Sequence, residues 1–304
     1  MQVLTDEAIR ALGVTPAQCV AWAESSLKSK PDADLPPKTW QHFPGDVFVN
    51  TMPCYIPSIK RYGVKVVTRH PGQHPALKST ILLVDMSDGD CLACMDGTWI
   101  TAMRTGAVEA LAGKTFVNDF EKAAFGFVGL GNMAHATFEC LYSLFDRPHD
   151  IWLLRYKNQA EEFLSRYGDR PNVRFHLTDS REELVLRTQA LYSCVTVMNE
   201  QFLSPDAYPL GYTLIPVHMR GFQECDLVFD RIFGDDTGHL SEFKYFDRFK
   251  SFAEFTDVLL GKKPGRQASD ERIICYNVGL GLHDVWFASR IYDMEMARGS
   301  GCQA

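Results

Sequence analysis

A six-residue run in the middle of the chain has the residue types and spacing of a phosphate-binding turn. It follows the apolar segment Ala123–Val128, which predicts a buried strand, and precedes a segment with helical spacing. The run reads Gly129-Leu130-Gly131-Asn132-Met133-Ala134, or G-x-G-x-x-A. Glycine at the first two positions lets the backbone approach a pyrophosphate, which then lies against free N–H groups of the helix N-terminus. We predict dinucleotide binding by Gly129, Gly131, Asn132, Met133 and Ala134. The alternative is an ordinary tight turn.

The residues after the next predicted strand bear on which dinucleotide would bind. In nicotinamide-binding domains, an acid at this place usually holds the ribose 2′-hydroxyl. Here Leu154 is followed by Arg155, Tyr156 and Lys157. A guanidinium suits a 2′-phosphate, so Arg155 and Lys157 favour NADP over NAD. NAD stays open, because both side chains could equally belong to a solvated loop.

Two pairs of potential metal ligands lie in segments that would not bring them together. Cys91 and Cys94 fall in a β-rich run, where an offset of three places side chains on opposite faces. His70 and His74 are separated by Pro71 and Gly72, which exclude a helix that would bring both imidazoles to one side. We therefore expect no metal. The glycine-serine elbow of hydrolases and the P-loop lysine of kinases are also missing from the sequence.

Composition limits the class of protein. The 304 residues, of which 46% are hydrophobic and 23% charged, suffice for two globular domains. A net charge of −7 argues against a nucleic-acid partner. No apolar stretch approaches the roughly 20 residues of a membrane span, and residues 1–10 lack the apolar core of a secretory signal. Nine cysteines without regular spacing indicate reduced thiols, so we expect a cytoplasmic protein without a membrane partner.

The first part of the chain predicts a helix followed by a largely antiparallel sheet. Apolar residues at helical spacing predict a helix over Thr5–Lys28, and three prolines in Lys30–Pro37 end it. Ser87–Asp90 has the residues of a hairpin turn. Four short β-rich runs predict strands at Val47–Val49, Val64–Thr68, Thr80–Asp85 and Cys91–Met95.

After Trp99 the pattern changes to alternating helices and strands. The helix Thr101–Phe116, the strand and glycine turn, the helix Asn132–Phe145 and the strand Asp150–Leu154 form a βαβ succession, which predicts a parallel sheet. The tail Ile273–Met296 begins β-like and ends as a helix. We predict an α/β protein with three parts: an N-terminal α+β domain over residues 1–116, a Rossmann-type doubly wound domain over 117–271, and a segment over 272–304 that returns to the first domain.

Several longer motifs resemble the ornithine cyclodeaminase and mu-crystallin family. Gly63–Val67 is similar to its G-V-K-x-V motif, and Met95–Ala107 to its D-G-x-x-I-T-A-x-R-T-A-A motif. The resemblance extends through Met52–Tyr55, the glycine turn, Gly265-Arg266 and Gly279–Asp284, so it covers most of the chain in order. It implies an N-terminal domain that binds substrate and forms a homodimer, a Rossmann-type domain for the cofactor, and a C-terminal helix that rejoins the first domain.

The resemblance also implies roles for individual residues. Lys65 and Arg104 would face the substrate carboxylate, which a guanidinium binds through two hydrogen bonds. Lys38 stands where many members have an arginine. The lysine keeps the positive charge but lacks the two parallel N–H donors, or fork, of a guanidinium. Alternatively, Lys65 points outward by strand alternation and Arg104 lies on a helix surface. Met52 would be a further substrate contact. The remaining cofactor contacts would be Thr80, Arg104, Thr105, Thr196 and Asn277.

One position departs from the pattern of ornithine cyclodeaminases. His218 falls where those enzymes have the aspartate that takes the side-chain amine of ornithine. An imidazole titrates near neutrality and exchanges protons, so we expect His218 to be catalytic and activity to respond to it between about pH 6 and 8. It offers no fixed negative charge to an ammonium group. The alternative is a histidine satisfied by hydrogen bonds at a strand end.

These residues together predict an NAD(P)-dependent oxidoreductase that acts at the Cα–N bond of a small amino or imino acid, as an ornithine cyclodeaminase does. Lys65 and His218 would be the catalytic residues. Two alternatives remain. One is a ketimine reductase of the mu-crystallin type, and the other is a cofactor-binding protein without significant turnover.

Overall fold

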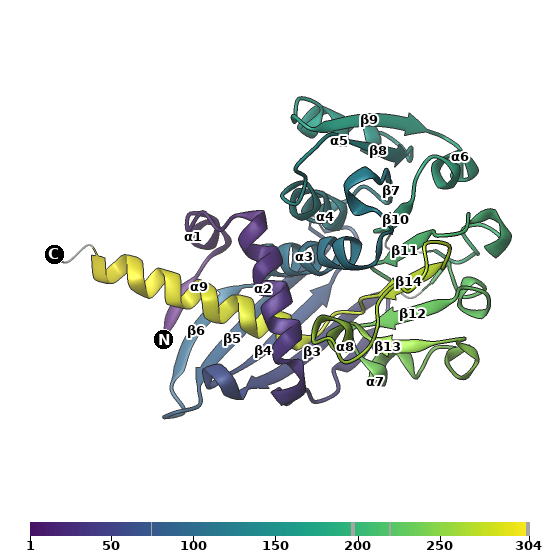
Figure 1. Cartoon of the computed structure of the whole chain (residues 1–304). Coiled ribbons are helices and arrows are strands. Elements are labelled where there is room, and N and C mark those ends of the chain that lie inside the picture. The colour runs from purple at the N-terminus through teal and green to yellow at the C-terminus, as the bar shows by residue number, and fades with distance from the viewer. Residues whose placement is uncertain (74, 196–197, 219, 302–304) are drawn as a thin grey trace. The chain divides into compact units, whose positions relative to one another are not determined.

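The chain divides into two units. The computed structural model describes residues 1–73, 75–195, 198–218 and 220–301, and Figure 1 shows its helices and strands. Unit 1 contains Met1–Arg104 and the chain from Gly279 onward, and unit 2 contains Thr105–Val278. These boundaries differ from the expected ones at 116 and 271. Helix α3 (Thr98–Phe116) continues across the first boundary without a change in periodicity, so the sequence pattern gives no sign of it there.

A six-stranded mixed sheet underlies unit 1, with the strand order β1-β6-β5-β4-β3-β2. β1 pairs with β6 in parallel, and the other neighbours pair antiparallel, as the β-rich runs predicted. The predicted turn at Ser87–Asp90 connects β5 to β6. The strands are β1 (Gln2–Leu4), β2 (Thr39–Phe43), β3 (Val47–Ile56), β4 (Arg61–Arg69), β5 (Leu77–Asp85) and β6 (Cys91–Asp96).

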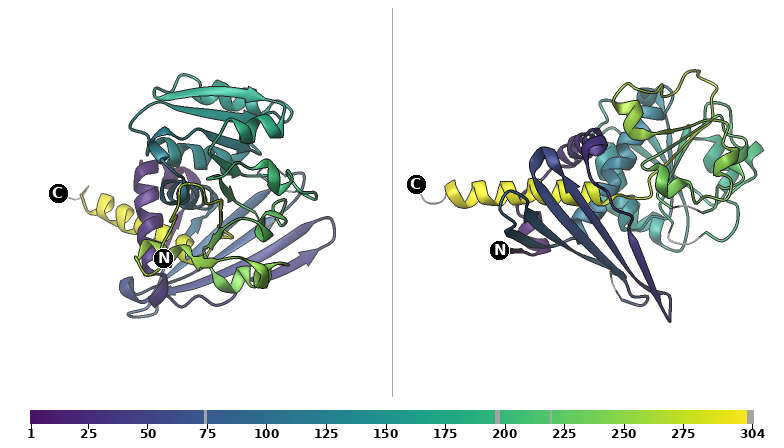
Figure 2. Two further views of the ribbon diagram at one scale, coloured as in Figure 1. Left: turned by 45° about the vertical axis from the view of Figure 1, so that its right-hand side comes forward. Right: turned by 90° about the horizontal axis from the view of Figure 1, so that it is seen from below.

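Helices cover one face of this sheet. α9 (Gly281–Gly301) packs on β3, β4 and β5, and α2 (Pro16–Ser29) packs on α9. Gly63 on β4 permits this packing, because a Cβ there would come within 2.7 Å of Val285 on α9. The C-terminal turns of α9 project past the sheet (Figure 2). The helix predicted over Thr5–Lys28 is broken into α1 (Asp6–Arg10) and α2, because Gly13 adopts a φ of +67°.

Strand alternation gives the sheet two different faces. Met52, Lys65, Ile81 and Met95 lie directly opposite one another on β3 to β6, so their side chains share a face, and all four are buried. Lys65 therefore lies on the helix-covered face. The other face carries exposed apolar side chains, such as Val66 and Leu82.

An eight-stranded parallel sheet forms unit 2. Its order is β13-β12-β14-β11-β10-β7-β8-β9, so the first five strands of the unit follow the Rossmann order 3-2-1-4-5. The strand order reverses between β7 and β10, and ligands of such sheets bind at the carboxyl ends of the strands near this point. The pattern predicted the βαβ succession around β7, but it does not reveal β12 and β13, which have only four and three residues.

The elements of unit 2 alternate along the chain. The strands are β7 (Phe125–Val128), β8 (His149–Leu154), β9 (Val173–Thr178), β10 (Ala190–Ser193), β11 (Thr213–Pro216), β12 (Arg231–Gly234), β13 (Phe252–Glu254) and β14 (Ile273–Tyr276). The α-helices are α4 (Asn132–Tyr142), α5 (Gln159–Tyr167), α6 (Arg181–Leu186), α7 (Thr237–Leu240) and α8 (Phe255–Leu259). Short 3-10 turns occur in both units at Lys30–Asp32, Pro57–Ile59, Phe120–Lys122, Pro205–Ala207, Cys225–Leu227 and Phe246–Arg248. Within the described part of the chain, every helix is too short or too polar to cross a membrane.

Candidate active site

Buried charged side chains gather on the covered face of the sheet in unit 1. Among the described residues of that unit, the buried charged side chains are Lys30, Lys65, Arg104 and Asp284. The Nζ of Lys65 lies 2.7 Å from Oδ2 of Asp284, and Nε of Arg104 donates to Oδ1 of Asp284 at 3.1 Å. Lys65 is 1% exposed and Asp284 is fully buried. Two basic groups thus contact one acid, and we call Lys65, Arg104 and Asp284 the charged cluster.

A different element positions each member of the charged cluster. Lys65 faces inward on β4, Arg104 lies in the second turn of α3, and Asp284 lies in the first turn of α9. α9 begins directly over β3, where a Cβ on Gly281 would come within 3.0 Å of the Met52 carbonyl oxygen. Gly279 has a φ of +90°, and a Cβ there would lie 2.8 Å from Nη1 of Arg104. Glycine at both positions therefore lets the chain pass the guanidinium and start the helix at this point.

Burial and charge determine the protonation of this cluster. Burial and the neighbouring Arg104 lower the pKa of Lys65 to about 7, although Asp284 opposes them. Burial raises the pKa of Asp284, but Arg104 and Lys65 together outweigh it and hold this pKa below its ordinary value of 3.8. Asp284 is therefore a carboxylate at neutral pH, and Lys65 is near its midpoint. An anion placed against Lys65 would favour the charged form of this side chain, so the Lys65 amine would bind a proton when the anion binds.

The structure brings two other predicted substrate contacts to this face. Met52 pairs directly with Lys65 across β3 and β4. Lys38 precedes β2, and its charge is close enough to contribute to the lowered pKa of Lys65. Its Nζ lies 5.6 Å from the centre of the Trp40 ring.

Thr80, a predicted cofactor contact, does not face the charged cluster. It pairs with Val66 rather than with Lys65, so strand alternation directs its side chain to the open, exposed face. The neighbouring Ser79 faces inward instead, and its hydroxyl lies 3.0 Å from the Thr101 hydroxyl. A resemblance of sequence identifies the segment, but only the strand register determines which of the two side chains points to the site.

The glycine turn in unit 2 has a geometry that suits a pyrophosphate. Gly129 has a φ of +76°, and a Cβ there would lie 2.6 Å from the backbone nitrogen of Val195. Gly131 caps the N-terminus of α4 without help from a side chain, and a Cβ there would meet nothing within 4 Å. Asn132, Met133 and Ala134 form the first turn of this helix. The N–H groups of that turn therefore border open space, which fits the phosphates of a dinucleotide.

The basic residues after β8 are less available than their sequence suggested. Arg155 donates from Nε to Glu161 at 3.0 Å and from Nη1 to Asp179 at 3.2 Å. Lys157 has a φ of 53°, and its ammonium lies 5.2 Å from the centre of the Tyr156 ring. A 2′-phosphate would have to compete with both carboxylates for Arg155, so the preference for NADP over NAD is weaker than the sequence alone indicated.

The other predicted cofactor contacts are placed as follows. Thr105 is buried in α3, at the first position of unit 2. Asn277 follows β14, and its Nδ2 donates to Oε2 of the buried Glu109 at 3.1 Å. Thr196 lies outside the described residues.

His218 lies at the carboxyl end of β11, and its environment differs from the one expected. Its Nε2 is 2.7 Å from the Ser193 hydroxyl, and its Nδ1 accepts from the backbone N–H of Arg220 at 3.4 Å. Burial lowers the pKa of His218 to about 4. An imidazole with this pKa is neutral between pH 6 and 8, so this environment does not favour the titration expected in that range. Lys65, with a pKa of about 7, is a group that titrates between pH 6 and 8.

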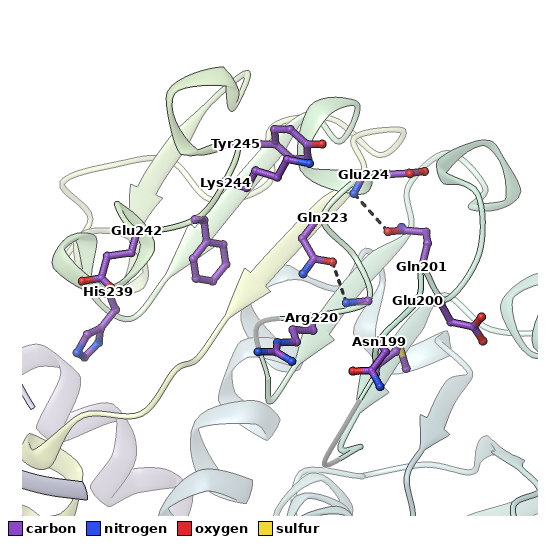
Figure 3. Close-up of a pocket in the computed structure, with 13 residues that line it drawn as sticks. Asn199, Glu200, Gln201, Arg220, Gln223, Glu224, His239, Glu242, Lys244 and Tyr245 are labelled. Carbon is purple, nitrogen blue, oxygen red and sulfur yellow. Dashed lines mark hydrogen bonds between the residues drawn. The ribbon is translucent and has the colours of Figure 1, made fainter. Parts of the chain in front are cut away.

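A pocket of about 630 Å³ opens at the carboxyl ends of β10, β11 and β12 in unit 2. In Figure 3, Arg220 directs its guanidinium toward the side of the pocket that carries His239 and Glu242, whereas Glu200 and Glu224 point the other way. The pocket thus lies at the carboxyl ends of the parallel strands, where Rossmann-type sheets bind their ligands.

Asp284 is the member of the charged cluster that the sequence did not single out. It belongs to the run Gly279–Asp284 that carried part of the resemblance, but no role was assigned to it. An acid in the first turn after two glycines is a signal of a helix N-terminus. That signal does not reveal its ion pairs with Lys65 and Arg104, because these form only in the folded chain.

Comparison with known proteins gives the family. The pattern of the ornithine cyclodeaminase/mu-crystallin family matches residues 2–207. The chain belongs to this family. Proteins similar to it include the alanine dehydrogenase of Archaeoglobus fulgidus, 26% identical over 88% of this chain and 87% of that protein. The ketimine reductase mu-crystallin of Rattus norvegicus is 26% identical over 81% and 80%.

A solved structure supports the fold of this ornithine cyclodeaminase/mu-crystallin family member. The Δ1-pyrroline-2-carboxylate reductase of Thermococcus litoralis, solved with NADH and L-proline, superposes with a TM-score of 0.85. It is 21% identical, and the match covers 98% of each chain. The predicted combination of a parallel Rossmann-type sheet, an N-terminal α+β part and a C-terminal helix is therefore confirmed.

Proposed function

We propose that this protein is an NAD(P)-dependent oxidoreductase that acts at the Cα–N bond of a small amino or imino acid. The observation that carries the proposal is the surplus of positive charge buried in unit 1. A buried charge without a partner costs several kcal/mol, and Lys65 and Arg104 share the single carboxylate of Asp284, so this site suits a second anion. The α-carboxylate of an amino acid supplies such an anion, and Arg104 can bind it through its fork.

The glycine turn would hold the dinucleotide, with Gly129 and Gly131 admitting the pyrophosphate to the N-terminus of α4. A bound nicotinamide would exchange a hydride with Cα of the substrate. Arg104 and Lys65 would fix the carboxylate and thereby orient Cα. The charge of the bound carboxylate would keep Lys65 protonated, so its ammonium could also donate a proton to the substrate nitrogen.

Reduction of an imino acid, or its reverse, is better supported than cyclisation of ornithine. His218 is neutral and hydrogen-bonded to Ser193, so it offers no counter-charge to the side-chain ammonium of ornithine. A cofactor-binding protein without turnover is less well supported, because such a protein gains nothing from the buried basic groups. We also retain the homodimer as a proposal, since Val66 and Leu82 are exposed on the open sheet face. A mass in solution near twice 34.3 kDa tests it.

A substrate screen tests the proposed activity. Small amino acids and cyclic imino acids are offered with NAD(H) and with NADP(H), and the absorbance of the reduced nicotinamide is followed. We expect turnover of imino acids with both cofactors, because the acids beside Arg155 weaken discrimination at the 2′-position. Binding of dinucleotide without any turnover would instead support the cofactor-binding alternative.

Replacement of His218 tests the choice between imine reduction and ornithine cyclisation. We expect His218→Asn to keep the pH dependence of imine reduction near neutrality, because its imidazole, with a pKa of about 4, is already neutral there. L-Ornithine should be a poor substrate until His218→Asp supplies a carboxylate. The measurement is kcat/KM from pH 5 to 9 for both variants. If the change in kcat/KM near pH 7 is lost in His218→Asn, the imidazole of His218 titrates near pH 7.

A further inference from the structure

Three aromatic rings lie together on the exposed edge of the sheet in unit 1. The Trp40 and His42 rings of β2 stack with centroids 6.1 Å apart, and the Phe48 ring of β3 meets Trp40 edge-on at 5.2 Å. Trp40 is 46% exposed. We call these three side chains the aromatic shelf. Exposed aromatic rings grouped in this way commonly form a binding surface.

Strand register places the aromatic shelf on the same face as the charged cluster. Trp40 pairs with Asn50, Asn50 with Val67, and Val67 with Ser79, and these three partners are buried on the covered face. These residues form a row across the sheet. The parallel row that contains Met52 and Lys65 lies two residues further along the strands. By the spacing of a sheet, the Cα atoms of Trp40 and Lys65 are about 12 Å apart. A lysine side chain, an indole ring and one bound amino acid span such a distance.

The aromatic shelf also lies beyond the end of the covering helix. The first residue of α9, Gly281, lies over Met52, which pairs with Lys65. One turn later, Val285 of α9 lies over Gly63. Because Gly63 lies on the far side of Lys65 from the row of Trp40, α9 runs away from the aromatic shelf. A ligand whose carboxylate lies against Lys65 and Arg104 could thus extend its side chain over Trp40 without meeting this helix.

The charge beside the aromatic shelf selects among side chains. The ammonium of Lys38 lies 5.6 Å from the centre of the Trp40 ring. A second ammonium on that ring would be held close to a like charge and repelled. A neutral planar group would instead gain the stacking preference of aromatic pairs.

We propose that Trp40, supported by His42 and Phe48, binds the side chain of the substrate and selects for a neutral planar or ring-shaped group over an ammonium. The inference rests on the proposed function, because it takes the charged cluster as the carboxylate site. It goes beyond that function in naming the substrate class and the residue that determines it.

A matched pair of variants tests the role of Trp40. Trp40→Ala removes the ring of the shelf, whereas Phe43→Ala removes a ring of the same strand that is 49% exposed and faces the opposite side. Turnover of L-phenylalanine, L-alanine and L-ornithine is measured with each protein. We expect Trp40→Ala to lower kcat/KM for L-phenylalanine about tenfold relative to that for L-alanine, and Phe43→Ala to leave the ratio unchanged. The inference is overturned if Trp40→Ala lowers kcat/KM equally for L-phenylalanine and L-alanine, or if Phe43→Ala has the same effect as Trp40→Ala. It is also overturned if the unmodified protein prefers L-ornithine to L-phenylalanine.

A binding measurement separates failure of this inference from failure of the proposed function. Calorimetric affinities for 3-phenylpropionate and propionate require no turnover. We expect the phenyl compound to bind more tightly, and this advantage to disappear in Trp40→Ala only. If no amino acid is turned over but the advantage is found, the proposed function fails and the aromatic subsite stands. If amino acids are turned over but no advantage is found, the aromatic subsite fails alone.

Discussion

Replacement of Arg104 by alanine is expected to abolish turnover while leaving dinucleotide affinity largely unchanged. The guanidinium is buried, and its Nε is already oriented by Asp284, so the fork is fixed before a carboxylate arrives. Loss of a buried charged hydrogen-bond donor costs about 3 kcal/mol, which corresponds to a fall of more than a hundredfold in kcat/KM. The measurement combines steady-state kinetics with a fluorescence titration of the reduced dinucleotide.

Two further variants make this result interpretable. Arg104→Lys keeps the charge and loses the fork, so its activity should fall between those of the unmodified protein and Arg104→Ala. Arg10→Ala, on the exposed surface of α1, should behave as the unmodified protein. Near-normal kcat and KM in Arg104→Ala, with the thermal midpoint retained, would remove Arg104 from the site.

Replacement of Asp284 by asparagine is expected to move the pH dependence of anion binding. Lys65 binds an anion when protonated, so affinity for a carboxylate should fall as the pH rises through the pKa of Lys65, which is about 7. Asp284 raises that pKa, and its removal should shift the midpoint to lower pH. Breaking a buried pair also costs stability, on the order of 3 kcal/mol in the free energy of unfolding. Calorimetric titration with propionate from pH 5 to 9 measures the shift.

A second acid on the same helix supplies the control. Asp293 of α9 is half-exposed, with Oδ1 3.8 Å from Nη2 of Arg61. Asp293→Asn should leave the midpoint of anion binding and the stability close to those of the unmodified protein, because exposed pairs contribute little. If Asp284→Asn and Asp293→Asn share the midpoint of the unmodified protein, Asp284 does not control the protonation of Lys65.

Local signals explain the parts of the site that the sequence predicts. The glycine turn, β7 and α4 are contiguous, so strand, turn and helix signals support one another within about twenty residues. Asp284 differs, since Arg104 lies 180 positions away in the chain and no local pattern links them. The face of Thr80 depends on the register between β4 and β5, which no local pattern gives. The pKa of His218 depends on burial, which only the tertiary structure gives.

The proposed function is transfer of a hydride between a nicotinamide and Cα of an amino or imino acid whose carboxylate lies on Arg104 and Lys65. The most direct measurement supplies reduced dinucleotide with deuterium at both hydrogen positions of nicotinamide C4, together with a small cyclic imino acid, and analyses the product by mass spectrometry. If the protein transfers a hydride in this way, we expect one deuterium at Cα of the amino acid formed by the unmodified protein, and none with Arg104→Ala. A product without deuterium at Cα, or equal labelling by both proteins, would contradict it.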